Sequence, residues 1–398
     1  MSEFSNHRQK RLEDLKVIFE AVTYKQNQLE VINQHKTSID NATPGDVVIL
    51  VHRLVESGMN MTDLKSGISK ILNVLHKTLD NFSDITPPSN TFFDVCLKNN
   101  LGAIEKLSDI RPLVVQINKS NNDEQTKIKI KAAWKAVEKF TSYYTIKENV
   151  LFPLAEKYLP DYKCIGVMWS IHDDTRRNIK EMINMLSSDS FDLKRFNKVT
   201  GDTFYNIYTM KYREEKLLYP FMLKNIPNDE IEKLWNESVK IGFPYFNPEQ
   251  KTEQKQEIYP TSEALNLGSG LLRLEQIVLI FNHLPVDITF VDELNKVRFF
   301  STPQKRIFTR TNAIIGRDVR NCHPHESVHV VEKIIDSFRR GEKEHADFWI
   351  NMKGHKVLIQ YFAVRNEQKE YKGVIEVTQE ISEIQAKNGE KRILDWEG

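Results

Sequence analysis

Two short segments repeat a pattern that can present carboxylates and an imidazole to a metal ion. The first is KENVLFP at 147–153, and the second is EEKLLYP at 214–220. His172 lies between them. Residues three or four positions apart share one helix face, so ligands at that spacing converge on one centre. The repeat therefore predicts facing helices of a four-helix bundle with metal-binding chemistry.

Both segments resemble the Glu-Glu-x-x-Leu-Phe-Pro runs of the hemerythrin-like HHE family. In that family a His precedes the first Glu by four residues, and the matching positions here are Tyr143 and Met210. The first Glu of the first run is replaced by Lys147. The chain thus keeps the scaffold pattern and departs from the ligand set. The candidate metal ligands that remain are Tyr143, Glu148, His172, Glu214 and Glu215.

These candidates leave several interpretations open. The neighbours of His172 are mostly apolar, which favours a hydrogen-bonded histidine packed in the bundle core. A mononuclear iron or zinc site built on His172, Glu214 and Tyr143 is a second interpretation, and a small-molecule pocket is a third. A dinuclear oxygen-carrying site is disfavoured, because it needs about five to seven His and carboxylate ligands and too few are present.

Length and composition bound the class of protein. A chain of 398 residues exceeds what one hydrophobic core serves, so two or three domains are expected. Its 56 basic and 55 acidic residues give a net charge of +1, and no overall field favours nucleic acid. The three cysteines, Cys96, Cys164 and Cys322, lie too far apart for a zinc ribbon, and their low number argues against a disulfide framework.

The chain is expected to be cytoplasmic. Residues 1–10 are polar and charged, unlike the apolar core of a signal peptide, and no uncharged apolar run reaches the length of a membrane span. Low cysteine usage suits a reducing compartment.

Periodicity divides the chain into helical and mixed parts. A helical segment is expected over 1–82, with one amphipathic helix over 8–41 and two further helices after the Thr43-Pro44 turn. The bundle is expected over 88–245, with helices at roughly 90–110, 123–158, 162–188 and 192–224. The charged, glutamine-rich stretch 246–263 is typical of a linker.

Beyond the linker the order of elements is that of a PAS domain, expected over 266–388 with a tail at 389–398. An amphipathic stretch precedes a hairpin within 287–300, short helical material ends near Gly316, and a helix is expected over 327–340. Three more strands are expected at 346–352, 355–365 and 371–380. The predicted fold is therefore multidomain: an all-α four-helix hemerythrin-like bundle with an N-terminal helical segment, then an α+β PAS domain with a five-stranded antiparallel sheet.

Longer motifs resemble the bacterial domain-of-unknown-function 438 family, which joins a helical segment, an HHE-type domain and a PAS domain. They are LPVDITFVD at 284–292, GRDVRNCHP at 316–324 and GEKRILDW at 389–396. This resemblance implies an architecture and no reaction.

The PAS region offers its own site candidates. Its aromatic residues are expected to fill a small core or line an apolar pocket, with Trp349 pointing inward beside Tyr361. Cys and His are axial ligands of haem, although a His-Pro before this helix can also cap the helix and face solvent. The pocket candidates are Phe290, Phe299, Phe308, Phe348, Trp349, Tyr361 and Phe362, and the haem-ligand candidates are Cys322, His323 and His329.

No motif for an enzyme is present, since the sequence contains no G-x-S-x-G, phosphate loop or C-x-x-C. The chain is predicted to be a non-enzymatic cytosolic sensor or adaptor that couples a PAS ligand or redox input to the bundle. No output pattern follows the PAS region, so a protein partner is expected, and a homodimer through the PAS domain is one arrangement. The alternatives are an iron- or haem-binding protein and a non-heme iron oxidoreductase.

Overall fold

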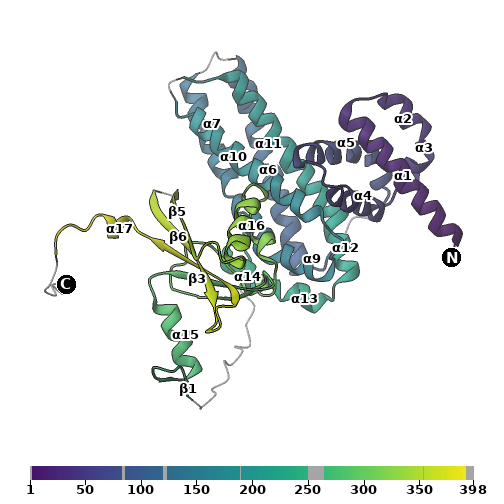
Figure 1. The fold of residues 1–398 in the computed structure, drawn as a ribbon. Coiled ribbons are helices and arrows are strands. Elements are labelled where there is room, and N and C mark those ends of the chain that lie inside the picture. Colours follow the sequence, from purple (N-terminus) through teal and green to yellow (C-terminus); the bar gives the residue numbers. More distant parts are fainter. Residues whose placement is uncertain are drawn as a thin grey trace. The chain divides into compact units, whose positions relative to one another are not determined.

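The computed structural model describes residues 2–82, 86–119, 123–188, 190–249, 264–352 and 354–390. The chain forms two compact units, Met1–Glu253 and Gln254–Gly398. Within the described residues the first unit is helical, and the second holds a five-stranded antiparallel sheet (Figure 1). A helix-rich region followed by an α+β region is thus confirmed. Most of the predicted linker, from residue 250 to 263, lies outside the described residues.

The N-terminal part of the helical unit contains five helices among the described residues. The prediction of one helix over 8–41 is wrong, because Lys25 and Asn27 have φ angles of 58° and 43° and end the first helix. Thr43 and Asp46 form a reciprocal capping box that begins the fourth helix. The helices are α1 (Ser2–Tyr24), α2 (Gln28–Gln34), α3 (Lys36–Asp40), α4 (Pro44–Glu56) and α5 (Met61–Leu79).

Four long helical runs lie side by side in the rest of this unit (Figure 1). We call these runs the bundle. Each run packs against two others, α6 against α7 and α11, and α10 against α7 and α11. Their buried side chains share one hydrophobic core with α1, α4 and α5. The bundle helices are α6 (Phe92–Lys119), α7 (Glu124–Glu138), α8 (Thr141–Ile146), α9 (Phe152–Tyr158), α10 (Cys164–Met185), α11 (Leu193–Arg213) and α12 (Tyr219–Asn225), and α13 (Asn228–Glu232) and α14 (Leu234–Ile241) follow.

Each repeated segment forms a π-helical turn, η1 (Lys147–Leu151) and η2 (Glu214–Leu218). Proline explains both turns. Its ring would collide with the carbonyl four residues earlier in an α-helix, and it has no N–H to donate. The residue before each proline donates its N–H five residues back instead, from Phe152 to Lys147 and from Tyr219 to Glu214. The first residue of each π-helical turn, Lys147 or Glu214, is buried.

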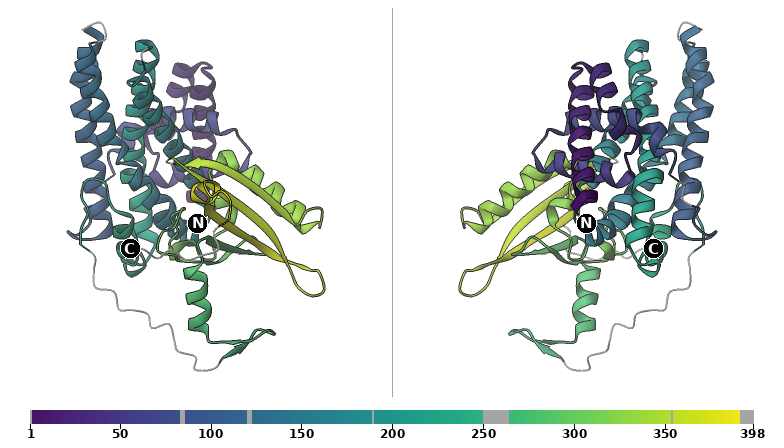
Figure 2. Two further views of the ribbon diagram at one scale, coloured as in Figure 1. Left: turned by 90° about the vertical axis from the view of Figure 1, so that its left-hand side faces the viewer. Right: turned by 90° about the vertical axis from the view of Figure 1, so that its right-hand side faces the viewer.

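The α+β unit follows the predicted order closely. Its sheet has the order β4-β3-β7-β6-β5, and all neighbours are antiparallel. Helix α16 lies along the sheet (Figure 2). A small hairpin, β1 (Leu265–Asn266) and β2 (Leu271–Leu272), precedes helix α15. The other elements are α15 (Leu274–His283), β3 (Asp287–Asp292), β4 (Val297–Phe300), η3 (Asn312–Ile314), η4 (Val319–Cys322), α16 (His325–Arg339), β5 (His345–Met352), β6 (His355–Arg365), β7 (Tyr371–Glu380) and α17 (Ser382–Gln385).

Among the described residues, no helix combines the length and the apolar character that a membrane span requires.

The contact between α1 and α5 is close enough to require glycine at one position. A Cβ atom on Gly67 would lie 2.3 Å from both Phe19 Cζ and Thr23 Oγ1, whereas a Cβ on Gly201 in α11 would meet nothing within 4 Å. We expect Gly67→Ala to lower the free energy of unfolding by about 1–3 kcal/mol through overpacking. The matched Gly201→Ala should raise it by roughly 0.5–1 kcal/mol. Urea denaturation followed by far-UV circular dichroism measures both, and equal effects would contradict the packing.

Candidate functional site

The centre of the bundle contains a buried ion pair between the two repeated segments. Lys147 and Glu214 are the first residues of their π-helical turns, and Lys147 Nζ lies 2.5 Å from Glu214 Oε1. Their side chains are 1% and 0% exposed. The ammonium also lies 3.8 Å from the centroid of the Tyr143 ring. Burial lowers the pKa of Lys147, and the Glu214 carboxylate opposes that shift.

Polar side chains satisfy the remaining acceptor positions of Glu214. Asn100 Nδ2 donates to Glu214 Oε2 at 3.0 Å, and the Tyr219 hydroxyl donates to the same oxygen at 2.9 Å. Asn100 also donates to Glu215 Oε1 at 3.1 Å. A buried carboxylate is stable only when it is paired and hydrogen-bonded, and these contacts together with the Lys147 ammonium provide that environment for Glu214.

Tyr143 takes part in a hydrogen-bond chain. Its hydroxyl lies 2.9 Å from the Tyr219 hydroxyl and 3.1 Å from the carbonyl of Cys96, and its single proton can be donated to one of these two oxygens at a time. Burial raises the pKa of Tyr143 well above its usual value. The phenol therefore stays protonated near neutral pH.

His172 belongs to a second buried group beside this one. Its Nδ1 lies 2.8 Å from Glu148 Oε1, and its ring stacks on Tyr144 with centroids 4.0 Å apart. Arg176 donates to both Glu148 oxygens at 2.8 Å, so the carboxylate charge is already compensated. Burial, with the nearby Lys147 and Arg176 cations, lowers the pKa of His172 well below its usual value. The imidazole is therefore neutral and donates through Nδ1.

The residues at the bundle centre do not fit a metal ion. Among the described residues, no three His, Cys, Asp or Glu side chains are placed to hold one. The five ligands predicted from the sequence divide into separate hydrogen-bonded groups, with Glu148 and His172 in one and Tyr143, Glu214 and Glu215 in the other. The Lys147 ammonium supplies the positive charge against Glu214. We derive no chemistry through a metal at this position.

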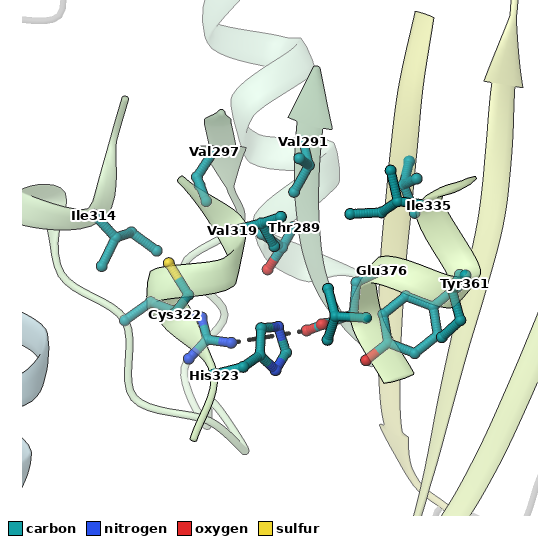
Figure 3. Close-up of a pocket in the computed structure, with 14 residues that line it drawn as sticks. Thr289, Val291, Val297, Ile314, Val319, Cys322, His323, Ile335, Tyr361 and Glu376 are labelled. Atoms are coloured by element: carbon teal, nitrogen blue, oxygen red, sulfur yellow. Dashed lines mark ion pairs between the residues drawn. The ribbon is translucent and has the colours of Figure 1, made fainter. Parts of the chain in front are cut away.

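The α+β unit contains a mostly apolar cavity between its sheet and helix α16 (Figure 3). Its volume is about 30 Å³, close to that of one water molecule. Strands β3, β4, β6 and β7 provide one wall, and η3, η4 and α16 provide the other. The apolar lining residues are Val291, Val297, Ile314, Val319, Val331, Ile334, Ile335 and Val374.

One end of this cavity is polar. Figure 3 shows Glu376, His323 and the Tyr361 hydroxyl gathered there. Arg310 Nη2 lies 4.0 Å from Glu376 Oε1, and both side chains are largely buried. Burial, the Glu376 charge and a hydrogen bond to Glu376 raise the pKa of Tyr361. Burial lowers the pKa of His323, so a neutral imidazole, a phenol and an ion pair face the apolar lining. This arrangement can orient a small apolar molecule with one polar group.

Most of the predicted aromatic pocket residues lie elsewhere. Of the seven, Tyr361 alone is among the residues that line the cavity. Side chains alternate along a strand, and Thr289, Val291 and Tyr361 point into the cavity. Phe290, Phe299 and Phe362 therefore point to the opposite face of the sheet, Phe308 lies in the loop after β4, and Phe348 and Trp349 lie on edge strand β5.

The prediction that Trp349 points inward is wrong, since 64% of its surface is exposed and it pairs with Leu358 rather than with Tyr361. Phe348 is 39% exposed. Residues 348–350 are all apolar, so the sequence shows no alternation of polar and apolar side chains that would tell which of them face the core.

Two of the three haem-ligand candidates, Cys322 and His323, line the cavity, and His329 is exposed on α16. A pocket for a drug-sized ligand encloses about 300–1,000 Å³. The cavity of about 30 Å³ is too small for a haem, so the residues in this arrangement do not fit that group.

Sequence reasoning missed the ion pair at the polar end. Glu376 interrupts an otherwise apolar stretch of β7, VIEV at 374–377, and its carboxylate points into the cavity. That interruption was the available signal. Its partner Arg310 lies in an irregular loop, where no periodicity gives direction.

Comparisons with known proteins bear on the α+β unit. Residues 277–382 match the family model described as a PAS domain. No curated protein matches the chain. This part of the chain is therefore a PAS domain, as the sequence predicted.

Three solved structures are similar to part of the chain. The C-terminal domain of a protein from Streptococcus mutans is 31% identical, and the match covers 31% of this chain and 96% of that one, with a TM-score of 0.30. The PAS domain of a protein from Colwellia psychrerythraea is 15% identical, with 28% and 98% covered and a TM-score of 0.22. A sensory box sensor histidine kinase from Vibrio cholerae is 12% identical, with 26% and 88% covered and a TM-score of 0.21.

The buried ion pair gives a test of the bundle centre. Lys147→Met leaves the Glu214 carboxylate buried without its cation, and we expect a loss of about 3–5 kcal/mol in the free energy of unfolding. The double variant Lys147→Met/Glu214→Leu removes both charges and should recover most of that loss. Arg195→Met breaks an exposed pair with Glu181 and should cost less than about 1 kcal/mol. Denaturant titrations compare the variants, and a Lys147→Met loss as small as that of Arg195→Met would contradict the assignment.

Proposed function

We propose that this chain is a non-enzymatic sensor whose PAS domain binds a small, largely apolar molecule with one polar group. The observation that carries the proposal is the cavity between the sheet and α16, which is apolar along its length and polar at one end. The ligand's polar group would contact Tyr361, His323 and the Arg310–Glu376 pair. The apolar body would contact the side chains of Ile334 and Ile335.

Because the cavity is small, binding of a ligand would change the structure around it. About 30 Å³ holds one water molecule, so a larger molecule enters only when α16 and the sheet move apart. A ligand that binds only the opened form shifts the population toward it. Binding in this cavity is therefore coupled to the position of α16, and that coupling is the sensing step.

The output of the sensor would be a change in protein contacts. The outer face of the sheet exposes large apolar side chains, including Trp349 at 64% and Phe362 at 38%. Helix α15 reaches the same face, since the Phe281 and Phe299 rings lie 5.4 Å apart, and it exposes Leu279 and Ile280. Exposed apolar patches of this kind mark protein contact sites. We propose a homodimer through this surface.

The remaining parts of the proposal concern the helical unit and the location of the protein. We propose that the helical unit responds to the PAS domain and that the protein works in the cytoplasm. Two observations on the described residues support the sensor over the alternatives of an iron- or haem-handling protein and a non-heme iron oxidoreductase. The Lys147–Glu214 ion pair lies at the bundle centre, and the PAS cavity is small.

The cavity is tested with a pair of isoleucines. Ile335→Ala removes a lining side chain, whereas Ile288→Ala removes a buried one whose neighbour Thr289 faces the cavity. Each variant should lose about 2–5 kcal/mol in the free energy of unfolding. With indole as the probe, we expect the melting temperature of Ile335→Ala to rise more than that of the wild type, and that of Ile288→Ala to rise no more than the wild type. Equal indole effects in the two variants would contradict a ligand site in this cavity.

The dimer surface is tested by adding a charge to it. Trp349→Asp places a carboxylate on the most exposed aromatic side chain of this apolar face, on edge strand β5, and should convert a dimer to a monomer, because burying that charge against a second copy is unfavourable. His329→Asp adds the same charge on the exposed side of α16, which covers the other face of the sheet, and is the control. Light scattering coupled to size-exclusion chromatography gives the mass. A wild-type monomer, or a Trp349→Asp dimer, would exclude this interface.

A further inference from the structure

A second buried cation in the helical unit lacks the compensation that Lys147 has. Arg213, the last residue of α11, is 4% exposed, and its Nη2 donates to Ser69 Oγ at 2.7 Å. Its Nε and Nη1 have no hydrogen-bond partner among the described residues. Within the part of the chain that the structure describes, no carboxylate forms an ion pair or a hydrogen bond with it. An isolated buried guanidinium is unfavourable, so its position requires an explanation.

A solvent-open cavity of about 380 Å³ lies between α5, α10 and α11, and Ser69 lines it. Ser69 belongs both to the cavity wall and to the contact with Arg213, so the guanidinium contacts a residue of the wall without lining the cavity itself. The volume lies within the range of about 300–1,000 Å³ that small-molecule sites occupy. The rest of the wall on α5 is polar and basic, with Thr62, Lys65, Ser66 and Lys70.

The charges around this cavity have a positive sum. Asp174 is the one acidic residue among its lining residues, and it is already paired with Lys65 on the wall and with Arg177 outside. Lys70 donates to the carbonyl of Thr23 at 3.0 Å and has no carboxylate partner among the described ion pairs. In the wall, Lys65 and Lys70 against Asp174 leave a surplus of one positive charge, and Arg213 and Arg177 each contact a wall residue. A cavity with walls of one sign concentrates ions of the opposite sign.

We propose that the cavity between α5, α10 and α11 binds a phosphoryl dianion, with Lys65, Lys70 and the hydroxyls of Thr62 and Ser66 as its contacts and Arg213 behind Ser69 as a positioning charge. The positive surplus of the wall, with Arg213 beside it, suits the negative charge of a phosphate monoester near neutral pH. A free phosphate ion fills only part of the space. The geometry therefore favours the phosphoryl group of a small metabolite over inorganic phosphate.

The site explains the burial of Arg213. A bound dianion offsets the charge that the helices bury, and the hydroxyl of Ser69 fixes the guanidinium toward the cavity. The Ser69 hydroxyl also donates to the carbonyl of Lys65 at 2.9 Å, so its orientation is set before a ligand arrives. Groups that are held in place before binding lower its entropic cost. This inference concerns the helical unit and is independent of the PAS cavity.

The test measures the melting temperature of the full chain at constant ionic strength in chloride, inorganic phosphate, glycerol 3-phosphate and succinate. We expect both phosphates to raise the melting temperature of the wild type and succinate to leave it unchanged, because a ligand that binds only the folded state stabilises it. A lower dissociation constant for glycerol 3-phosphate in calorimetry supports the metabolite. A lower or equal constant for inorganic phosphate would overturn that part. No rise with either phosphate up to about 50 mM would overturn the whole proposal.

Three variants locate the effect. Arg213→Met should remove the phosphate-dependent rise while leaving the melting temperature in chloride equal to or above that of the wild type, since an uncompensated buried charge is replaced by an apolar side chain. Lys70→Gln changes a half-buried wall residue that folding tolerates, and it should weaken phosphate binding about tenfold. Arg195→Met, at the exposed start of α11, is the control and should keep the full response. A response unchanged in both Arg213→Met and Lys70→Gln would overturn the site.

Discussion

The ion pair between Lys147 and Glu214 is the constraint on which the centre of the bundle depends. The two residues occupy equivalent positions in the repeated segments, and the π-helical turns before Pro153 and Pro220 bring them to the same place. Two carboxylates at these positions would repel each other and require protonation or a bound cation. Lys147 removes that requirement, because the covalently attached ammonium provides the positive charge. Asn100 and the tyrosine pair can then complete the hydrogen bonds of Glu214 without any ligand.

The two buried cations of the helical unit differ in how they are compensated. Lys147 has a carboxylate partner and aromatic faces around it, so the bundle centre is complete as it stands. Arg213 has one hydroxyl and no carboxylate among the described residues. The same low dielectric that strengthens the first interaction makes the second costly. The difference separates a group that serves the fold from one that indicates a binding site, although both are buried basic residues within the same hydrophobic core.

The sequence predicted elements well where periodicity or proline decides them. Strands β6 and β7 begin and end at the predicted residues. In both repeated segments the helix changes its hydrogen-bonding pattern next to the proline, Pro153 or Pro220. The break after α1 was missed, because Lys25 and Asn27 adopt left-handed backbone conformations within a polar stretch that carries no glycine or proline signal. The outward direction of the Trp349 side chain was also missed, since three consecutive apolar residues do not show which face of the strand is buried.

Side-chain partnership was less predictable than the elements. Lys147 was recognised as a departure from the ligand pattern, but its pairing with Glu214 depends on how two segments 67 residues apart face each other. The Arg213 contact with Ser69 spans 144 residues and follows no motif. Charges compensate one another through space, whereas motifs record only spacing along the chain. The sequence could therefore identify residues able to act as ligands or ion-pair partners. The packing of α5 against α10 and α11 decides which buried charge is left without a carboxylate partner, and so which cavity is suited to an anion.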